Sequence, residues 1–210
     1  MERALTKHSA IVQTGTIVVI VGTERKNYTL HEKLLTHHSQ YSRCALSGNF
    51  KESDDRVVTL EDVDTEAFDF LVDWLYDRKL PAFQKAWDVN RMPLRLHAYV
   101  LADRLLMPLL KKAIFDYYFE IYMPKNIFPS YSAIGFAFTN LPARDPLLQL
   151  WIDAFCVNNG IEIYKRVFGE CDSQISTLPQ EALARLLQKT HTVANLSAEE
   201  KALKRTDYTI

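Results

Sequence analysis

Three histidines and one glutamate fall within a stretch of eight residues and are the first groups in this chain whose types could support chemistry. In the stretch HEKLLTHH they are His31, Glu32, His37 and His38. The HExxH pattern of zinc hydrolases places two histidines one helical turn apart and uses the glutamate as a base. Here Leu35 occupies the second ligand position, and two helical turns separate His31 from His38 by about 10 Å. The spacing argues against zinc, so a metal-dependent hydrolase using His31, Glu32 and His38 is only a remote alternative.

The rest of the sequence contains no other pattern typical of catalysis or of a cofactor site. A GxSxG nucleophile turn, a phosphate-binding glycine loop and a GxGxxG motif after a strand are all absent. The three cysteines lie far apart and form no CxxC pair, which argues against a disulfide framework and a zinc knuckle. We therefore expect a protein that is not an enzyme and that has no catalytic residue, metal or cofactor.

Charge and hydropathy disfavour two further classes of partner. The 25 Lys and Arg residues are balanced by 26 Asp and Glu residues, and neither sign clusters into a long run. This balance disfavours direct nucleic-acid binding. The longest apolar run, IVVIV, is too short to cross a bilayer, and no secretory signal pattern follows the first methionine. We expect an intracellular protein, cytoplasmic or nuclear, that binds neither nucleic acid nor membrane directly.

The elements that must position the histidines are two strands and a helix. Residues 16–22, TIVVIVG, and the short YTL segment at 28–30 predict a β-hairpin, and RVVTL at 56–60 predicts a third strand. Between them an apolar repeat at spacings of three and four predicts one helix from His31 to the breaker Gly48. Its expected buried face contains Leu34, Leu35, His38, Tyr41, Ser42 and Ala45.

Helices dominate the remainder. Asp64 is the expected N-cap of a helix, because acidic residues follow it in the first turn. The apolar stripe expected on that helix is Phe68, Leu71, Val72 and Leu75. A longer apolar repeat follows, and Pro108 should divide it into two helices because proline lacks an N–H and clashes with the preceding turn. That repeat consists of Leu96, Val100, Leu105, Leu109, Ala113 and Tyr117.

Two more helices are predicted in the C-terminal part of the chain. DPLLQLWIDAFCVNNG has Asp145 in the N-cap position, Pro146 at the first helical position and Gly160 after the end. LPQEALARLLQKT repeats its leucines on one face.

In their order and spacing these pieces resemble a BTB/POZ domain, in the style of the many fungal BTB proteins. SGNFKES, VVTLEDVDTEAFDFLVDWLY and LADRLLMPLLKKA carry the resemblance, which covers residues 15–120. It implies an α+β fold, a helical cluster with a small three-stranded sheet. Residues 124–200 are expected to form an all-α C-terminal extension, and residues 1–14 and 201–210 are expected to be flexible ends.

The resemblance also implies a function. Family members act as protein–protein interaction modules, adaptors or scaffolds, and some are substrate adaptors of cullin-type ubiquitin ligases. The partners implied are a cullin or a second BTB chain, with a monomer or weak homodimer as the oligomeric state. The alternative is a transcription-linked regulator that acts through a protein partner.

Four residues are candidates for partner contacts, three of them by position in the resemblance. In the adaptors the cullin is held near the end of the helix containing WLY and by the following helices, which places Phe70, Tyr76 and Leu80 at the interface. Dimeric regulators of the family have an aspartate before the first strand and a basic residue after the helix-starting histidine. Here these positions are Thr16 and Glu32, so Glu32 is expected to be an exposed contact that reads a different partner. The histidine itself is expected to be a framework residue.

Overall fold

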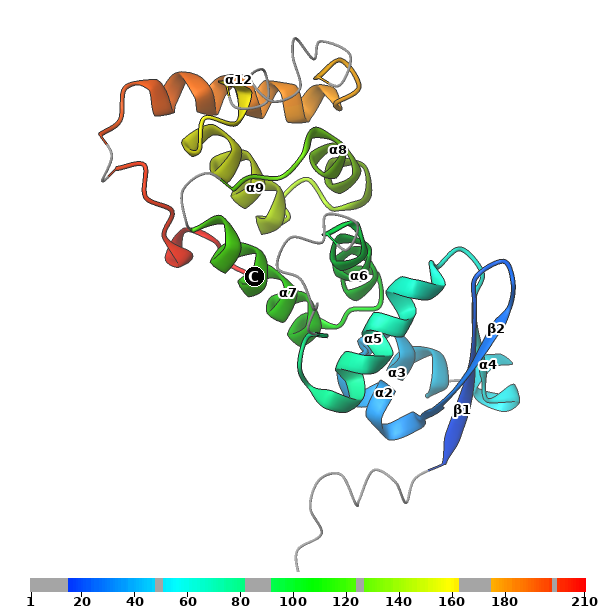
Figure 1. Ribbon diagram of the computed structural model, residues 1–210. Helices are drawn as coiled ribbons and strands as arrows, with labels where there is room; N and C mark the ends of the chain where they lie inside the picture. The colour runs from blue at the N-terminus through cyan, green and yellow to red at the C-terminus, as the bar shows by residue number, and fades with distance from the viewer. Residues whose placement is uncertain (1–14, 48–50, 82–91, 124–126, 163–174, 198–199) are drawn as a thin grey trace, which may run out of the picture. The chain divides into compact units, whose positions relative to one another are not determined.

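The computed structural model describes residues 15–47, 51–81, 92–123, 127–162, 175–197 and 200–210 (Figure 1). The expected flexible end at residues 1–14 lies outside these ranges. The chain divides into two compact units, residues 1–111 and residues 112–210, and each is described by itself. None of the helices in the described ranges is both long and apolar enough to span a membrane.

A three-stranded sheet lies in the first unit. It consists of β1 (Thr16–Val21), β2 (Lys26–His31) and β3 (Val57–Leu60), in the order β2-β1-β3. β1 pairs antiparallel with β2 and parallel with β3, so the predicted hairpin and third strand are confirmed. Successive side chains of a strand point to opposite faces of the sheet, and the side chains on one face are buried. That buried face contains Ile17, Val19, Val21, Leu30, Val58 and Leu60.

The predicted single helix after His31 is wrong: two short helices replace it. They are α2 (Glu32–His38) and α3 (Gln40–Leu46), followed by α4 (Lys51–Asp55). Ser39 separates α2 from α3 because its backbone is extended, with φ −116° and ψ 113°. Its hydroxyl accepts a hydrogen bond from Ser42 N, which makes Ser39 the N-cap of α3.

The next helix, α5 (Thr65–Asp77), lies with α2 and α3 on one side of the hairpin (Figure 1). Its predicted N-cap is confirmed, since the Asp64 carboxylate accepts from Glu66 N at 2.8 Å. Its expected apolar stripe is mostly buried, although Val72 is only half-buried. The buried residues of α5 are Ala67, Phe68, Phe70, Leu71, Trp74 and Leu75.

Two helices meet at Pro108, as predicted. α6 (Met92–Arg104) ends four residues before it, and α7 (Pro108–Tyr122) begins with it and continues into the second unit. The turn between them closes with a hydrogen bond from Met107 N to Ala102 O, 2.8 Å.

The second unit is all-helical in its described residues. After α7 come α8 (Tyr131–Asn140), α9 (Pro146–Val157), α12 (Gln180–Ala194) and the short 3-10 helix η1 (Arg205–Asp207). α9 is buried on nearly every side because α8 and α12 both pack on it. Its predicted cap is confirmed: the Asp145 carboxylate accepts from Leu147 N at 2.9 Å, and Pro146 starts the helix.

The last residues of the chain are anchored, which differs from the flexible end expected for residues 201–210. Tyr208 is buried, and its hydroxyl donates to Asp153 on α9 at 2.9 Å. The charged composition predicts fraying, whereas a buried aromatic side chain with a buried hydrogen-bond partner helps to hold the segment.

Candidate protein-interaction surface

Three large apolar side chains are exposed where α3 meets the turn between α6 and α7. Tyr41 is 40% exposed, Leu106 is 50% exposed and Leu109 is 53% exposed. The two segments that carry them are joined directly, because Gln40 N donates to Leu106 O at 3.2 Å. We call Tyr41, Leu106 and Leu109 the junction patch. Exposed apolar groups gathered at one place are typical of protein-binding surfaces.

The buried Ser39 connects α3 to the end of α6 below the junction patch. The Ser39 hydroxyl is fully buried and donates to Leu105 O at 2.8 Å while accepting from Ser42 N at 3.0 Å. One side chain therefore caps α3 and ties it to the end of α6. Together with the bond from Gln40 N to Leu106 O, this hydrogen bond holds the start of α3 against the turn that carries Leu106.

Leu106 has an unfavourable backbone conformation. Its φ is 52°, in the left-handed region, which costs a residue with a side chain about 1–2 kcal/mol. It follows the end of α6 at a position where glycine is usual, because the turn needs a positive φ. Glycine at this position would relieve the strain but would remove the exposed side chain.

Charged residues border the patch. The Arg104 guanidinium binds both oxygens of the Asp62 carboxylate at 2.7 and 2.8 Å. This pairing raises the pKa of Arg104 and lowers the pKa of Asp62, so both stay charged near neutral pH. An apolar centre with a charged rim is the usual anatomy of a protein–protein interface.

Tyr76, a predicted contact, has a structural role as well. Its hydroxyl lies 2.9 Å from His31 Nδ1 and accepts from His31 N at 3.3 Å. These bonds fasten the end of β2 to the last turn of α5. The framework role expected for His31 is confirmed, and Tyr76 keeps part of its ring exposed at the same corner.

Glu32, the second predicted contact at this corner, is half-buried and paired. Its carboxylate forms an ion pair with Arg56, which also donates to Thr16 O at 3.4 Å. Glu32 is therefore less exposed than expected from the sequence, and it is paired. The cation that the resemblance places after the histidine comes instead from the residue just before β3.

We expect Glu32→Lys to lower the free energy of unfolding by about 1 kcal/mol, because it sets two cations side by side in place of a surface ion pair. Urea denaturation measures the change. The double variant Glu32→Lys with Arg56→Glu restores the pair with reversed signs and should recover most of the loss. Equal stability of Glu32→Lys and the wild-type chain would show that the pair contributes nothing.

The remaining two predicted contacts differ in exposure. Phe70 is only 3% exposed and lies on the buried face of α5, inside the core. Leu80 follows the end of α5 and is half-buried. The structure thus brings Glu32 and Tyr76 to one corner through His31 but removes Phe70 from the surface.

His31 and His38 of the HEKLLTHH stretch have different partners. His31 bonds to Tyr76, whereas the His38 ring lies edge-on to Trp74 with ring centroids 5.7 Å apart. Arg78 covers the same indole at 3.9 Å. Among the described residues, no group of three His, Cys, Asp or Glu side chains is arranged to hold a metal ion.

Comparison with known proteins decides the family. Residues 12–118, slightly more than half of the chain, match the model of the BTB/POZ domain. The chain belongs to the BTB/POZ family. BTB domains are protein-interaction modules, and the small sheet with its surrounding helices is the BTB fold.

Each similar protein matches only part of this chain, and the curated relatives match over only a small part of their own length. Kelch repeat and BTB domain-containing protein 4 of Homo sapiens and of Mus musculus is 34% identical over 58 residues, which is 28% of this chain and 11% of each relative. The chain thus spans a small fraction of the length of the curated relatives it matches. The BTB (Tramtrack and Bric a brac) domain of human gigaxonin is 13% identical, covers 56% of this chain and 98% of its own, and has a TM-score of 0.39. The BTB domain of zebrafish PATZ1 is 16% identical, with coverages of 57% and 98% and a TM-score of 0.41.

The junction patch of this BTB domain was missed by sequence reasoning. Tyr41 was placed on the buried face of one continuous helix, and the break at Ser39 moves it to the surface. Leu109 belonged to the apolar repeat but lies on the exposed side of α7. The sequence contains one signal for this break: Ser39 lies three residues before Ser42, the spacing at which an N-cap serine accepts from a backbone N–H.

His38 makes the stability of the BTB domain depend on pH. Burial, with Arg78 and His37 nearby, lowers the pKa of His38 to about 4. Since the unfolded chain has a His38 pKa near 6.5, acidification from about pH 6.5 to about pH 4 protonates the unfolded state first and destabilises the fold.

We expect His38→Gln to remove this part of the acid sensitivity. Urea unfolding at about pH 7 and about pH 5 should show a smaller loss of stability for the variant than for the wild-type chain. His191→Gln, at an exposed position of α12, is the control and should behave as wild type. If His38→Gln and the wild-type chain lose the same stability between the two pH values, His38 is not the source of the acid sensitivity.

Proposed function

We propose that this chain is a non-enzymatic adaptor or scaffold whose BTB domain docks a protein partner on the junction patch. The observation that carries the proposal is Leu106, an exposed leucine kept in a strained backbone at the centre of an apolar surface. Leu106 is 50% exposed, and a docked partner would bury the exposed part and gain the hydrophobic free energy.

A cullin-type ubiquitin-ligase scaffold is the partner that we propose first. The BTB family supports a protein partner, and an apolar patch between two helix ends suits an amphipathic helix of that partner. We propose that Tyr76, Glu32 and Leu80 contact its periphery, and that Phe70 supports these contacts from the buried face of α5. We further propose that residues 15–120 form the docking domain, that residues 124–200 form the helical extension, and that the protein acts inside the cell.

The sharpest test is Leu106→Gly. Glycine accepts the positive φ, so the variant should be at least as stable as the wild-type chain. It also removes the exposed side chain and should weaken partner binding about tenfold, the effect of losing one well-buried contact. Stability and affinity would then change in opposite directions, which damage to the fold cannot produce.

Leu109→Arg gives a second, stronger perturbation of the same surface. Its matched control is Leu187→Arg on α12, where the leucine is 76% exposed and lies outside the BTB domain. Isothermal titration calorimetry with the N-terminal region of the host cullin should show lost binding for Leu109→Arg and unchanged binding for Leu187→Arg.

The outcomes separate the branches of the proposal. Absence of a cullin complex at micromolar concentration would remove the ligase branch. Light scattering that shows a dimer disrupted by Leu109→Arg would then assign the patch to a second BTB chain. Unchanged cullin binding by both Leu106→Gly and Leu109→Arg would overturn the assignment of the patch.

A further inference from the structure

The C-terminal residues 205–208, which we call the strap, bind to the helices of the second unit through side chains, as a peptide ligand would. Tyr208 is buried, and its hydroxyl donates to Asp153 Oδ2 at 2.9 Å. Its ring lies against two aromatic rings of α7, with centroids 6.0 Å from Phe115 and 6.1 Å from Phe119. The helices thus provide an aromatic slot with a carboxylate at its far end.

Arg205 supplies the second anchor. Its Nε and Nη2 atoms each lie 2.8 Å from Asp116 Oδ1, and its guanidinium covers the Phe115 ring at 4.6 Å. Its Nη1 atom donates to Tyr208 O, so the strap also closes on itself. Arg205 and Tyr208, three residues apart, thus anchor the strap to α7 and α9 through their side chains.

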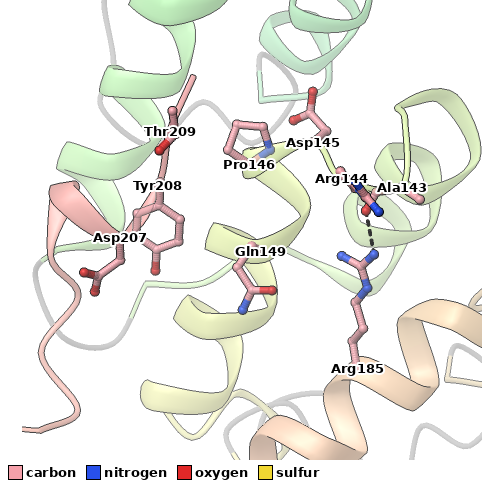
Figure 2. A pocket seen from close by; sticks show the side chains of 9 residues that line it. All are labelled: Ala143, Arg144, Asp145, Pro146, Gln149, Arg185, Asp207, Tyr208 and Thr209. Atoms are coloured by element: carbon pink, nitrogen blue, oxygen red, sulfur yellow. Dashed lines mark hydrogen bonds between the residues drawn. The ribbon is translucent and has the colours of Figure 1, made fainter.

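The strap is also one wall of an open pocket of about 370 Å³ (Figure 2). Tyr208 and its two neighbours in the chain form that wall, and the connection before α9 with Arg185 of α12 forms the opposite one. Arg185 is itself held in place, because it donates to Ala143 O and pairs with Glu181. The pocket leaves room for chain that continues beyond the tyrosine.

We propose that the helical unit contains a binding site for peptides with an arginine three residues before a tyrosine, and that this chain fills the site with its own residues 205–208. Asp116 recognises the cation, Asp153 recognises the hydroxyl, and Phe115 with Phe119 recognise the ring. The site is separate from the junction patch and does not depend on the function proposed for the BTB domain.

The attachment of the strap determines when the site is available. The strap is joined to the end of α12 by the residues between Ala194 and Arg205, and the described ones among them form no helix or strand. A short tether gives an effective concentration in the millimolar range. The strap therefore excludes weak ligands, and a partner peptide with the same motif enters only when it binds more tightly or when the strap is released.

The test uses the full chain with Arg205→Ala and Tyr208→Ala as the acceptor and a fluorescent peptide of residues 201–210 as the ligand. Fluorescence polarisation should show saturable binding to this double variant and at least tenfold weaker binding to the wild-type chain, whose own strap competes. A peptide with phenylalanine in place of Tyr208 should bind about tenfold more weakly, as expected for a lost hydrogen bond to a carboxylate. A peptide with Thr206→Ala is the control, since Thr206 is exposed and does not line the pocket.

Three results would overturn the proposal. They are a folded double variant that binds no peptide, equal binding of the tyrosine and phenylalanine peptides, and loss of helical circular dichroism in the double variant. The last would make the strap part of the fold and not a ligand of it. Hydrogen exchange on the wild-type chain gives an independent readout: strap amides should exchange as one group and much faster than those of α9, and exchange at the rate of α9 would also overturn the proposal.

Discussion

Replacing Ser39 with alanine is expected to lower the free energy of unfolding of the BTB domain by about 2–3 kcal/mol. The substitution removes the N-cap of α3, which contributes about 1 kcal/mol. It also leaves Leu105 O, which accepts from the Ser39 hydroxyl at 2.8 Å, without that donor. An unsatisfied buried carbonyl costs about 1–3 kcal/mol, because the methyl group of alanine cannot replace the bond and leaves little room for water.

Urea denaturation followed by circular dichroism measures this loss. The matched control is Ser47→Ala, since Ser47 is an exposed serine at the other end of α3. We expect the control to change stability by less than about 0.5 kcal/mol. A comparably small effect of Ser39→Ala would contradict the structure of the junction. If the BTB domain docks a partner on the junction patch, Ser39→Ala should weaken binding as well, because it frees α3 from the end of α6.

The second large effect is expected at Asp153 in the helical unit. Its carboxylate is almost fully buried on α9 and binds Lys189 of α12 at 2.7 Å and the Tyr208 hydroxyl at 2.9 Å. Asp153→Ala should destabilise the unit by about 3 kcal/mol, because it leaves a partly buried cation and a buried hydroxyl without partners. The same carboxylate raises the pKa of Tyr208 together with burial, so the phenol stays protonated and remains a donor.

Two further variants make the Asp153 result specific. Asp153→Asn keeps an acceptor for Tyr208 but removes the charge that pairs with Lys189, so its loss should be smaller than that of alanine. Glu120→Ala removes an exposed carboxylate from α7 and should change stability by less than about 0.5 kcal/mol. Thermal unfolding followed by tryptophan fluorescence is a suitable probe, because Trp151 lies buried on the same helix as Asp153. Equal effects of Asp153→Ala and Glu120→Ala would contradict the buried network.

The features that could be predicted from sequence are those with a local cause. The hairpin, the third strand, the caps Asp64 and Asp145, and the break at Pro108 all follow from residues within one turn or one strand. Each is determined by nearby backbone hydrogen bonds or by the missing N–H of proline. The order of these elements also carried the resemblance to the BTB family.

The features that could not be predicted depend on partners far along the chain. The break between α2 and α3 occurs at Ser39 because a carbonyl 66 residues away accepts its hydroxyl. Without that partner, the apolar repeat from Leu34 to Tyr41 fits one helix equally well. The expected exposure of Glu32 failed for the same reason, since its partner Arg56 comes from the start of a different strand.

The sequence by itself determined most of the elements, their order and the BTB family of this protein, because local hydrogen bonding and apolar periodicity act within a few residues. Only the tertiary structure decided which apolar side chains stay in solvent. Tyr41, Leu106 and Leu109 are exposed because Ser39 joins α3 to α6 and because Leu106 takes a left-handed turn. It also decided that Tyr208 is buried, because the aromatic slot and the carboxylate that receive it come from two other helices.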